Sequence, residues 1–389
     1  MGADHRTYFI RPDGNYFINP EQGEDPFSTL TYGKTGGFVQ AGVRLLGEKL
    51  RLTATVHADK NNYFSTRFNP RLTAVYSLTP RHNFRVSYQS GYRSPSLFEG
   101  FSNVNSGQVK RIGGLRVMSG GVFENSYLRS SIDAFNNAVT AAINANTTSA
   151  SAAEKRRLAI EQNQGRLVRN PYTYLKPEYI RSFKAGYKAA LLPDARLLLD
   201  VDFYYNSYRD FIAQVEAYVP KTNNPDSAAI YLNSRATQNR YRLWTNAQSK
   251  VYNYGGSLGL RYDVAGGYLA GASVTYARLD RTESGDGLED GFNTPRWAYN
   301  LRMGNESVYK NLGFGLNYRW QDSYYSQTFL VVGNVPAYHT LDAQLSYRVP
   351  APKLRFKLGA SNLLNDYYVS YLAAPSVGGL YYLAVTYGL

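Results

Sequence analysis

The fold is decided by residues 312–321, which read LGFGLNYRWQ. Large apolar side chains alternate here with glycine and polar side chains, so an extended strand would carry one apolar face and one polar face. A helix needs apolar residues three to four positions apart, and this stretch lacks that spacing. The pattern therefore predicts a β-strand with two chemically different faces.

The same alternation recurs along the whole chain, for example at residues 50–59, 252–263 and 341–349. Most of the predicted strands reach the roughly 9–11 residues that a tilted membrane-spanning strand needs, whereas strands of ordinary globular domains have about five or six. The pattern predicts about thirteen strands, at residues 35–46, 50–59, 70–78, 83–92, 179–191, 197–209, 250–264, 268–279, 296–304, 312–322, 338–349, 354–361 and 380–389.

The connections between these strands alternate in length. The short ones carry the Gly, Pro and Asp of tight turns, at residues 47–49, 79–81, 193–195, 265–267, 308–310 and 350–352. The long ones are polar, at residues 93–178, 210–249, 280–295, 323–337 and 362–379. Short turns at one rim and long loops at the other are typical of outer-membrane barrels. We therefore predict an all-β protein, a transmembrane antiparallel β-barrel whose polar face lines a water-filled lumen.

Composition excludes several classes of protein. The 389 residues include no cysteine, so disulfide frameworks and thiolate metal sites are excluded. The chain has no run of 18 apolar residues, which excludes a transmembrane helix. The net charge of +14 permits acidic partners without identifying one.

The longest loop, residues 93–178, is expected to carry two helices. The first begins near residues 130–133 and presents Ile132, Phe135 and Val139 on one stripe. The second follows residues 151–154, where the serine and the glutamate form a capping box. We predict a helical extracellular insertion that covers the barrel mouth, within a partial barrel domain that spans residues 1–389.

Arginines and aromatic rings in the loops, and charges on the polar face, supply the candidate site residues. Aromatic rings beside arginine recognise sugars, chelates and peptides, although membrane interfaces have a similar composition. The candidate ligand-binding residues are Arg93, Glu99, Arg240, Tyr241, Arg242 and Trp244. The candidate lumen-lining residues are Arg261, Asp263, Arg302, Arg319 and Arg348.

Two further motifs resemble functional sites but lack the spacing or the setting that those sites need. Asp286, Glu289 and Asp290 offer the oxygen ligands that Ca²⁺ takes, but without EF-hand spacing, and we expect a solvated acidic loop rather than a metal site. Residues 255–259 match the G-x-S-x-G pattern of hydrolases, but they lie in the middle of a predicted strand instead of at a strand-to-helix turn. We expect no catalytic residue, no enzyme activity and no cofactor.

Four segments resemble the TonB-dependent outer-membrane receptors, particularly those of Bacteroidetes-type bacteria. Residues 92–99, YRSPSLFE, are similar to a strand-to-loop junction of that family. Residues 175–178, LKPE, followed by FKAGYK at 183–188, are similar to one of its strands. Residues 362–368, NLLNDYY, and 375–382, PSVGGLYY, are similar to the approach to its last strand. The four segments occur in the family's order.

The resemblance implies the distal part of a barrel of about 22 strands, filled by an N-terminal plug. Nothing in the chain resembles that plug, so we expect a fragment. An odd number of strands would also start the chain outside the cell, which again predicts a missing upstream piece. The implied function is nutrient uptake at the outer membrane of a Gram-negative bacterium. Its implied partners are the TonB-ExbB-ExbD complex acting through the missing plug, outer-membrane lipid and lipopolysaccharide, and a surface lipoprotein, with no nucleic acid.

Two alternatives from other classes stay open at this point. One is a passive porin or a surface-adhesion barrel that works without a plug. The other is a soluble basic β-protein that binds polysaccharide or nucleic acid, which the positive net charge would permit.

Overall fold

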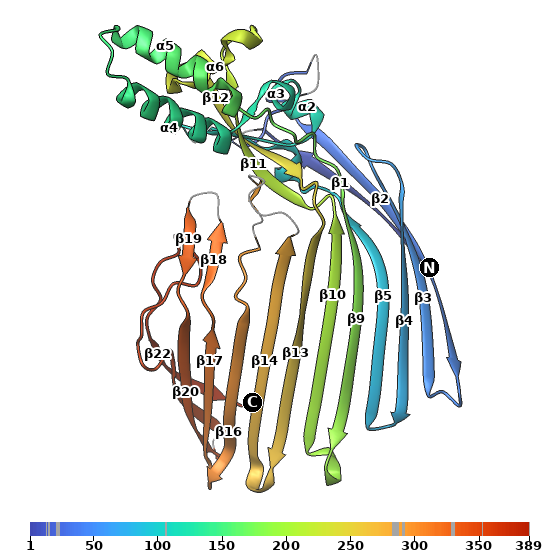
Figure 1. Cartoon of the computed structure of the whole chain (residues 1–389). Helices are drawn as coiled ribbons and strands as arrows, with labels where there is room; N and C mark the ends of the chain where they lie inside the picture. Colours follow the sequence, from blue (N-terminus) through green and yellow to red (C-terminus); the bar gives the residue numbers. More distant parts are fainter. Residues whose placement is uncertain are drawn as a thin grey trace.

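The computed structural model describes residues 1–12, 14, 16–20, 24–105, 107–281, 288–289, 292–327, 331–351 and 353–388. Its main feature is a curved sheet of fourteen strands, each paired antiparallel with its neighbours (Figure 1). The strands follow one another in chain order across the sheet, which begins at β1 and ends at β22. Their bounds are β1 Gly2–Ile10, β2 Leu30–Leu45, β3 Leu50–Asn61, β4 Arg67–Thr79, β5 His82–Arg93, β9 Glu178–Leu191, β10 Leu197–Arg209, β13 Val251–Val264, β14 Tyr268–Arg281, β16 Trp297–Tyr309, β17 Leu312–Gln321, β20 Tyr338–Val349, β21 Leu354–Ser361 and β22 Leu380–Tyr387.

Every predicted strand lies on a strand of this sheet, so the prediction of an antiparallel membrane-type sheet is confirmed. The predicted count is one too low, because β1 is absent from the prediction. With fourteen strands the first and last strands run in opposite directions. The odd strand count, on which the predicted extracellular start of the chain rested, is therefore wrong.

The strand register gathers the apolar side chains on one face of the sheet. Leu316 lies opposite Met303 on one neighbouring strand and opposite Ala343 on the other. The Leu316 side chain is in the middle of its strand and yet 43% exposed. A β-sandwich would bury such residues against a second sheet, whereas a membrane barrel leaves them for acyl chains to cover. None of the described helices has the length and hydropathy needed to cross a membrane.

Aromatic rings form a belt on this apolar face near the long-loop ends of the strands. The ring centroids of Tyr276 and Trp297 are 4.7 Å apart, and those of Tyr299 and Trp320 are 5.0 Å apart. Tyr and Trp gather at this level in membrane barrels because one end of the ring system is apolar and the other prefers water. The belt therefore marks the level at which the membrane surface crosses the sheet.

Above the sheet lies a second unit, the cap, built from residues 97–175, 212–246 and 288–289 (Figure 1). A six-stranded sheet forms its centre, in the order β15-β11-β12-β7-β6, with β8 paired to β11. The strands of the cap are β6 Asn103–Asn105, β7 Lys110–Ile112, β8 Tyr127–Leu128, β11 Ile212–Pro220, β12 Gln238–Asn246 and β15 Leu288–Glu289. The α-helices are α1 Leu97–Phe101, α2 Arg116–Ser119, α3 Val122–Asn125, α4 Arg129–Ala145, α5 Ala152–Asn163 and α6 Ala228–Leu232.

Residues 210–249 connect β10 to β13, which pair directly, as predicted, but the connection contains an antiparallel hairpin of β11 and β12 that the sequence did not predict. The strand signal is weak since two positions on the apolar face of β11 are alanines, Ala213 and Ala217. Residues 323–337 also contain a short hairpin, β18 Tyr324–Gln327 paired with β19 Val332–Val335.

The two expected helices of the long loop are α4 and α5. Phe135 and Val139 of α4 are buried against Ala159 and Ile160 of α5. The hydroxyl of Ser151 accepts a hydrogen bond of 3.2 Å from the backbone N–H of Glu154, which caps α5. Only this half of the predicted capping box is seen, because the Glu154 carboxylate pairs with Arg157 instead. The amphipathic stripe of α4 thus covers α5 and part of the cap sheet, which gives the cap a hydrophobic core of its own.

Two consecutive glycines allow the segments of the cap to cross closely. A side chain at Gly114 would collide with the carbonyl oxygen of Trp244, and one at Gly113 with the carbonyl oxygen of Gly100. The backbone of Gly114 is also hydrogen-bonded on both sides. Its N–H donates to the backbone carbonyl oxygen of Glu99, and its carbonyl oxygen accepts from the backbone N–H of Leu175. These contacts leave no room for a Cβ atom.

Replacing Gly114 with alanine is therefore expected to lower the stability of the cap by about 1–3 kcal/mol, as overpacking generally does. Limited proteolysis of the folded protein would measure it as faster cleavage within residues 97–175. The matched control is Gly165→Ala, because nothing lies within 4 Å of a Cβ added at Gly165. Equal cleavage rates for the two variants would contradict this prediction.

Candidate ligand-binding surfaces

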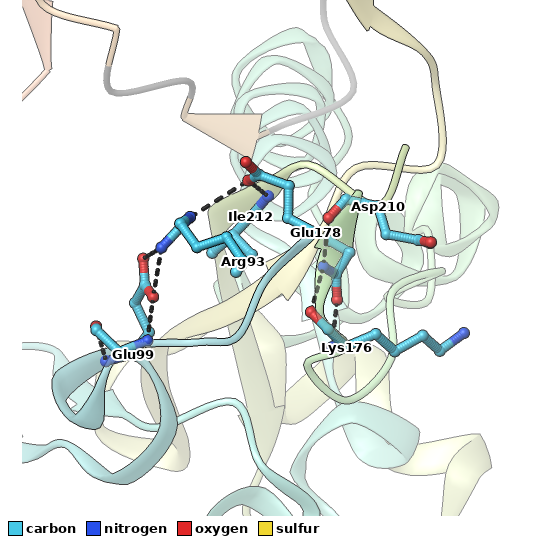
Figure 2. Close-up of polar contacts among 8 residues, drawn as sticks. Arg93, Glu99, Lys176, Glu178, Asp210 and Ile212 are labelled. Carbon is cyan, nitrogen blue, oxygen red and sulfur yellow. Dashed lines mark hydrogen bonds and ion pairs between the residues drawn. The ribbon is translucent and has the colours of Figure 1, made fainter. Parts of the chain in front are cut away.

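A network of ion pairs and hydrogen bonds joins the cap to the main sheet, and we call it the junction (Figure 2). Arg93 is the last residue of β5, and its Nη1 donates at 2.9 Å to both carboxylate oxygens of Glu99 in α1. Its Nη2 lies 3.3 Å from the carboxylate of Glu178, the first residue of β9. The same Glu178 oxygen accepts the backbone N–H of Ile212, where β11 begins, at 2.9 Å. Four elements are thus tied together at one point.

Asn246, the last residue of β12, completes the junction. Its side-chain oxygen accepts the N–H of Lys176 at 2.7 Å, and its side-chain nitrogen donates to the carbonyl oxygens of Lys176 and Asp210. Asn246 therefore fixes the end of the cap hairpin to the segments that enter β9 and leave β10. No local sequence signal points to this role, because its partners lie 36 and 70 residues away.

The structure thus places Arg93 and Glu99, two of the candidate ligand residues, inside the junction. Glu99 also accepts the N–H of Ser96 and closes the capping box of α1. Both side chains already have ionic partners that orient them. Their contact with a ligand stays a prediction, whereas their part in holding the cap is seen directly.

The other four ligand candidates lie on β12, which sends them to two opposite faces of the cap sheet. Tyr241 packs against the main hydrophobic core of the cap, together with Leu243. Arg240, Arg242 and Trp244 alternate with it and share the other face. The four residues therefore do not form one aromatic and basic platform.

On that second face, a buried carboxylate organises the arginines. Glu216 of β11 accepts a hydrogen bond of 2.7 Å from Arg242 and one of 2.6 Å from Arg129 of α4. The side chains of Arg242 and Glu216 are only 11% and 12% exposed. Arg240 lies over the ring of Tyr218, with its guanidinium carbon 4.8 Å from the ring centroid. These contacts bind α4 to the cap sheet.

Burial also raises the pKa of two cap tyrosines. Burial raises the pKa of Tyr218, and the charge of Glu216 beside it raises the pKa further. Burial alone raises the pKa of Tyr241. Tyrosine is already neutral at physiological pH at its ordinary pKa, so these upward shifts only extend its neutral form further into the alkaline range.

The five lumen candidates all lie on the polar face of the main sheet. In register, Arg261 is opposite Gly271, Gly271 is opposite Arg302, and Arg302 is opposite Asn317. Asp263 follows Arg261 by two positions on the same strand, and the two side chains are 3.4 Å apart. The ionic partners of the other two candidates are Asp342 for Arg319, at 2.9 Å, and Glu306 for Arg348, at 3.8 Å.

A hollow of about 600 Å³ opens on this face between β13 and β21, toward the short-turn end of these strands. Its charged lining comprises Arg261, Asp263, Arg302, Glu306, Arg355 and Lys357. Arg355 and Lys357 are absent from the sequence candidates, although their alternation with Leu354, Phe356 and Leu358 could have revealed them. The hollow has room for a small solute, and its cations outnumber its carboxylates.

A second polar cluster, which the sequence could have revealed, is absent from the predicted lumen residues. Arg85 of β5 donates to Asp200 at 2.6 Å and to both oxygens of Asp202, two residues further along β10. The pair reaches across β9, where Gly186 leaves space for the arginine. Two aspartates at alternate positions of a strand are the available signal. The cluster is an internal ion pair on the lumen side.

The acidic loop gives no metal site that can be described. Asp286 and Asp290 lie outside the described residues, and the backbone of Glu289 pairs with Gln214 in β15. Across the described ranges, no three His, Cys, Asp or Glu side chains gather closely enough to hold a metal ion. The G-x-S-x-G pattern lies within β13, where Ser257 faces Asp202 and Thr275 on the neighbouring strands.

Comparison with solved structures shows that this fold is similar to that of three solved proteins. The FrpB iron transporter from Neisseria meningitidis, in its apoprotein form, superposes with a TM-score of 0.60 at 15% identity, over 99% of this chain and 52% of its own. The siderophore receptor PirA from Acinetobacter baumannii superposes with a TM-score of 0.58 at 12% identity, over 99% of this chain and 54% of PirA. A variant of the ferric enterobactin receptor PfeA from Pseudomonas aeruginosa superposes with a TM-score of 0.58 at 14% identity, over 98% of this chain and 49% of PfeA. The chain thus spans about half the length of the solved receptors that it matches.

Sequence comparison agrees with the fold. No curated protein matches the chain. The family model for the TonB-dependent receptor-like β-barrel, however, matches residues 1–363. Members of this family are outer-membrane transport proteins rather than enzymes, which agrees with the exposed apolar face and argues against a soluble β-protein. This chain belongs to the TonB-dependent receptor family, through its β-barrel domain.

Proposed function

We propose that the chain forms part of an outer-membrane receptor that takes up an anionic nutrient, with chelates of ferric iron as the substrate class. The observation that carries the proposal is the cationic hollow of about 600 Å³ on the polar face. Arg261, Arg302, Arg355 and Lys357 face only Asp263 and Glu306 there. Cations concentrated in a confined polar space attract anions and raise their local concentration.

Several of these cations are available to a solute. Among the described residues, Arg302, Arg355 and Lys357 make no ion pair. A neighbouring hollow of about 510 Å³ continues the cationic lining with Lys188, Arg261 and Arg302 beside Asp200. The polar face therefore offers a succession of positive positions along which an anion could pass.

The structural neighbours support iron chelates as the class to test first. FrpB is described as an iron transporter, PirA as a siderophore receptor and PfeA as a ferric enterobactin receptor. Ferric iron held by carboxylate or catecholate oxygens forms anions, which match the positive lining. Energy for uptake would come from the TonB-ExbB-ExbD complex acting on a plug. The receptor would lie in the outer membrane of a Bacteroidetes-type bacterium, with a surface lipoprotein as its partner.

The double variant Arg302→Gln with Lys357→Gln tests the hollow. In the bacterium that encodes the chain, we expect uptake of the iron chelate to fall about thirtyfold, because each of the two lost charges removes an attraction of about 1 kcal/mol. The measurement is uptake of radiolabelled iron supplied as defined chelates. The matched control is Arg196→Gln, whose guanidinium pairs with Asp194 at the tight turn between β9 and β10 and does not line the hollow.

Three outcomes would contradict the proposal. Unchanged uptake in the double variant would show that the hollow does not handle the substrate. Uptake that persists after deletion of tonB would favour the passive porin. Preference for neutral or cationic solutes would exclude the anionic class while leaving the family assignment intact.

A further inference from the structure

We propose that the lipid-facing wall carries a binding site for the phosphate group of an outer-leaflet lipid, in a notch between β4 and the paired strands β5 and β9. The notch is a hollow of about 560 Å³. This inference concerns the outer wall and does not depend on what the receptor transports. It follows from the strand pairing, the charges in the notch and the level at which they lie.

The notch exists because β4 separates from β5 near the long-loop end. The last paired residues of the two strands are Arg71 and Gln89. Beyond them, Pro70 through Arg67 still pair with β3, while β5 continues to pair with β9 as far as Arg93. Pro70, which has no backbone N–H to donate, is the first residue after the separation. The wall is therefore open at this point.

Three arginines line the opening: Arg181 and Arg209 from strand positions on the apolar face, and Arg67, which alternates with Phe68, from a position on the polar face. Arg67 and Arg209 lie over the ring of Tyr179, with their guanidinium carbons 5.2 Å and 5.9 Å from its centroid. Arg181 lines the same hollow, as does Lys250. Within the described part of the chain, none of the three arginines makes an ion pair with a carboxylate. The Nε of Arg67 is buried and has no hydrogen-bond partner among the described residues.

A phosphate group fits this lining. Guanidinium groups form paired, charge-assisted hydrogen bonds to phosphate oxygens. The hydroxyls of Ser90 and Ser207, which also line the notch, can add neutral donors. The three guanidinium groups of Arg67, Arg181 and Arg209 repel one another unless an anion lies between them, so a dianionic group is the ligand that these charges favour.

The level of the notch identifies the source of the phosphate as a lipid. Arg181 is in register with Ser90 and Ser207, and two positions lower the row Tyr88, Phe183 and Tyr205 occupies the same face. Two strand residues span roughly 7 Å. All three of those rings are exposed on the membrane side of the sheet. The cations thus lie just above the aromatic belt, at the height of lipid headgroups.

Phe68 supports the same source. It borders the notch, its side chain is 69% exposed, and its strand position puts it on the apolar face. An acyl chain attached to the bound headgroup would cover it. The notch therefore has the two features that an anionic lipid requires, which are cations for its phosphate group and an apolar surface for its acyl chain.

The test is lipid binding by the protein purified from outer membranes in mild detergent, measured by native mass spectrometry. The probes are bis-phosphorylated lipid A, the same lipid after enzymatic dephosphorylation, and inorganic phosphate. The variant is Arg181→Gln with Arg209→Gln. Its matched control is Lys184→Gln, on the same strand as Arg181 but on the opposite face. A charge-keeping pair, Arg181→Lys with Arg209→Lys, separates loss of charge from misfolding.

We expect affinity for bis-phosphorylated lipid A to fall about fivefold for each arginine removed. The control should bind as the unchanged protein does, and the lysine pair should keep most of the affinity. Equal binding of the dephosphorylated lipid would overturn the proposal, and this arm needs no variant. Equal affinity for inorganic phosphate would also overturn it, since the site would then serve a soluble anion. Failure here would leave the uptake proposal standing.

Discussion

Replacing Glu216 with alanine is expected to destabilise the cap by about 3–5 kcal/mol, the typical loss when one member of a buried ion pair is removed. The Glu216 carboxylate receives hydrogen bonds from Arg242 and Arg129, and both it and Arg242 are nearly buried. Its loss leaves the Arg242 charge in a low-dielectric setting without that carboxylate. It also removes the ionic contact between α4 and the cap sheet.

Hydrogen exchange on the intact protein can measure this effect separately from the barrel. Amides of β11, β12 and α4 should exchange faster in the variant, whereas amides of β14 and β17 should keep their protection. The matched control is Glu161→Ala, since Glu161 also binds an arginine, Arg157, but both side chains are about half exposed. Such an exposed pair contributes little to stability, because water and salt screen it. Equal effects of the two substitutions would show that the buried carboxylate is not what holds the cap together.

The strands of the main sheet could be predicted because the signal for each one is local. A strand between lipid and water needs an apolar side chain at every second position, whatever lies far away in the sequence. Leu312 to Gln321 follows this rule without exception, and the five lumen candidates were found from the same alternation. The contrast disappears in β1, where Ile10 belongs to the polar-face side yet is buried against Phe101 and Leu115 of the cap. A strand whose inner face is covered by protein no longer alternates between apolar and polar.

The cap and the junction could not be predicted because their contacts join distant segments. Arg93 meets a carboxylate 85 positions further along the chain, and that carboxylate also binds the backbone of β11. From the sequence alone, Arg93 and Glu99 are a charged pair in a loop, as suitable for a ligand as for a structural contact. On β12, the spacing of Arg240, Arg242 and Trp244 against Tyr241 already implied two faces, but only if the segment was known to be a strand.

The decisive test of which face meets the membrane is arginine at Leu316, which is expected to cost about 2–4 kcal/mol of unfolding free energy. Leu316 lies at mid-strand between Met303 and Ala343, so the new charge would sit among acyl chains and could reach water only by distorting the strand. Arginine at the next residue, Asn317, should have a mild effect, because Asn317 faces the lumen, where its amide lies 3.4 Å from the carboxylate of Asp342. Equilibrium unfolding of the receptor in bilayers would measure both variants. The reverse order of the two losses would mean that the apolar face is turned inward, and the lumen residues and the lipid-phosphate notch would then exchange sides.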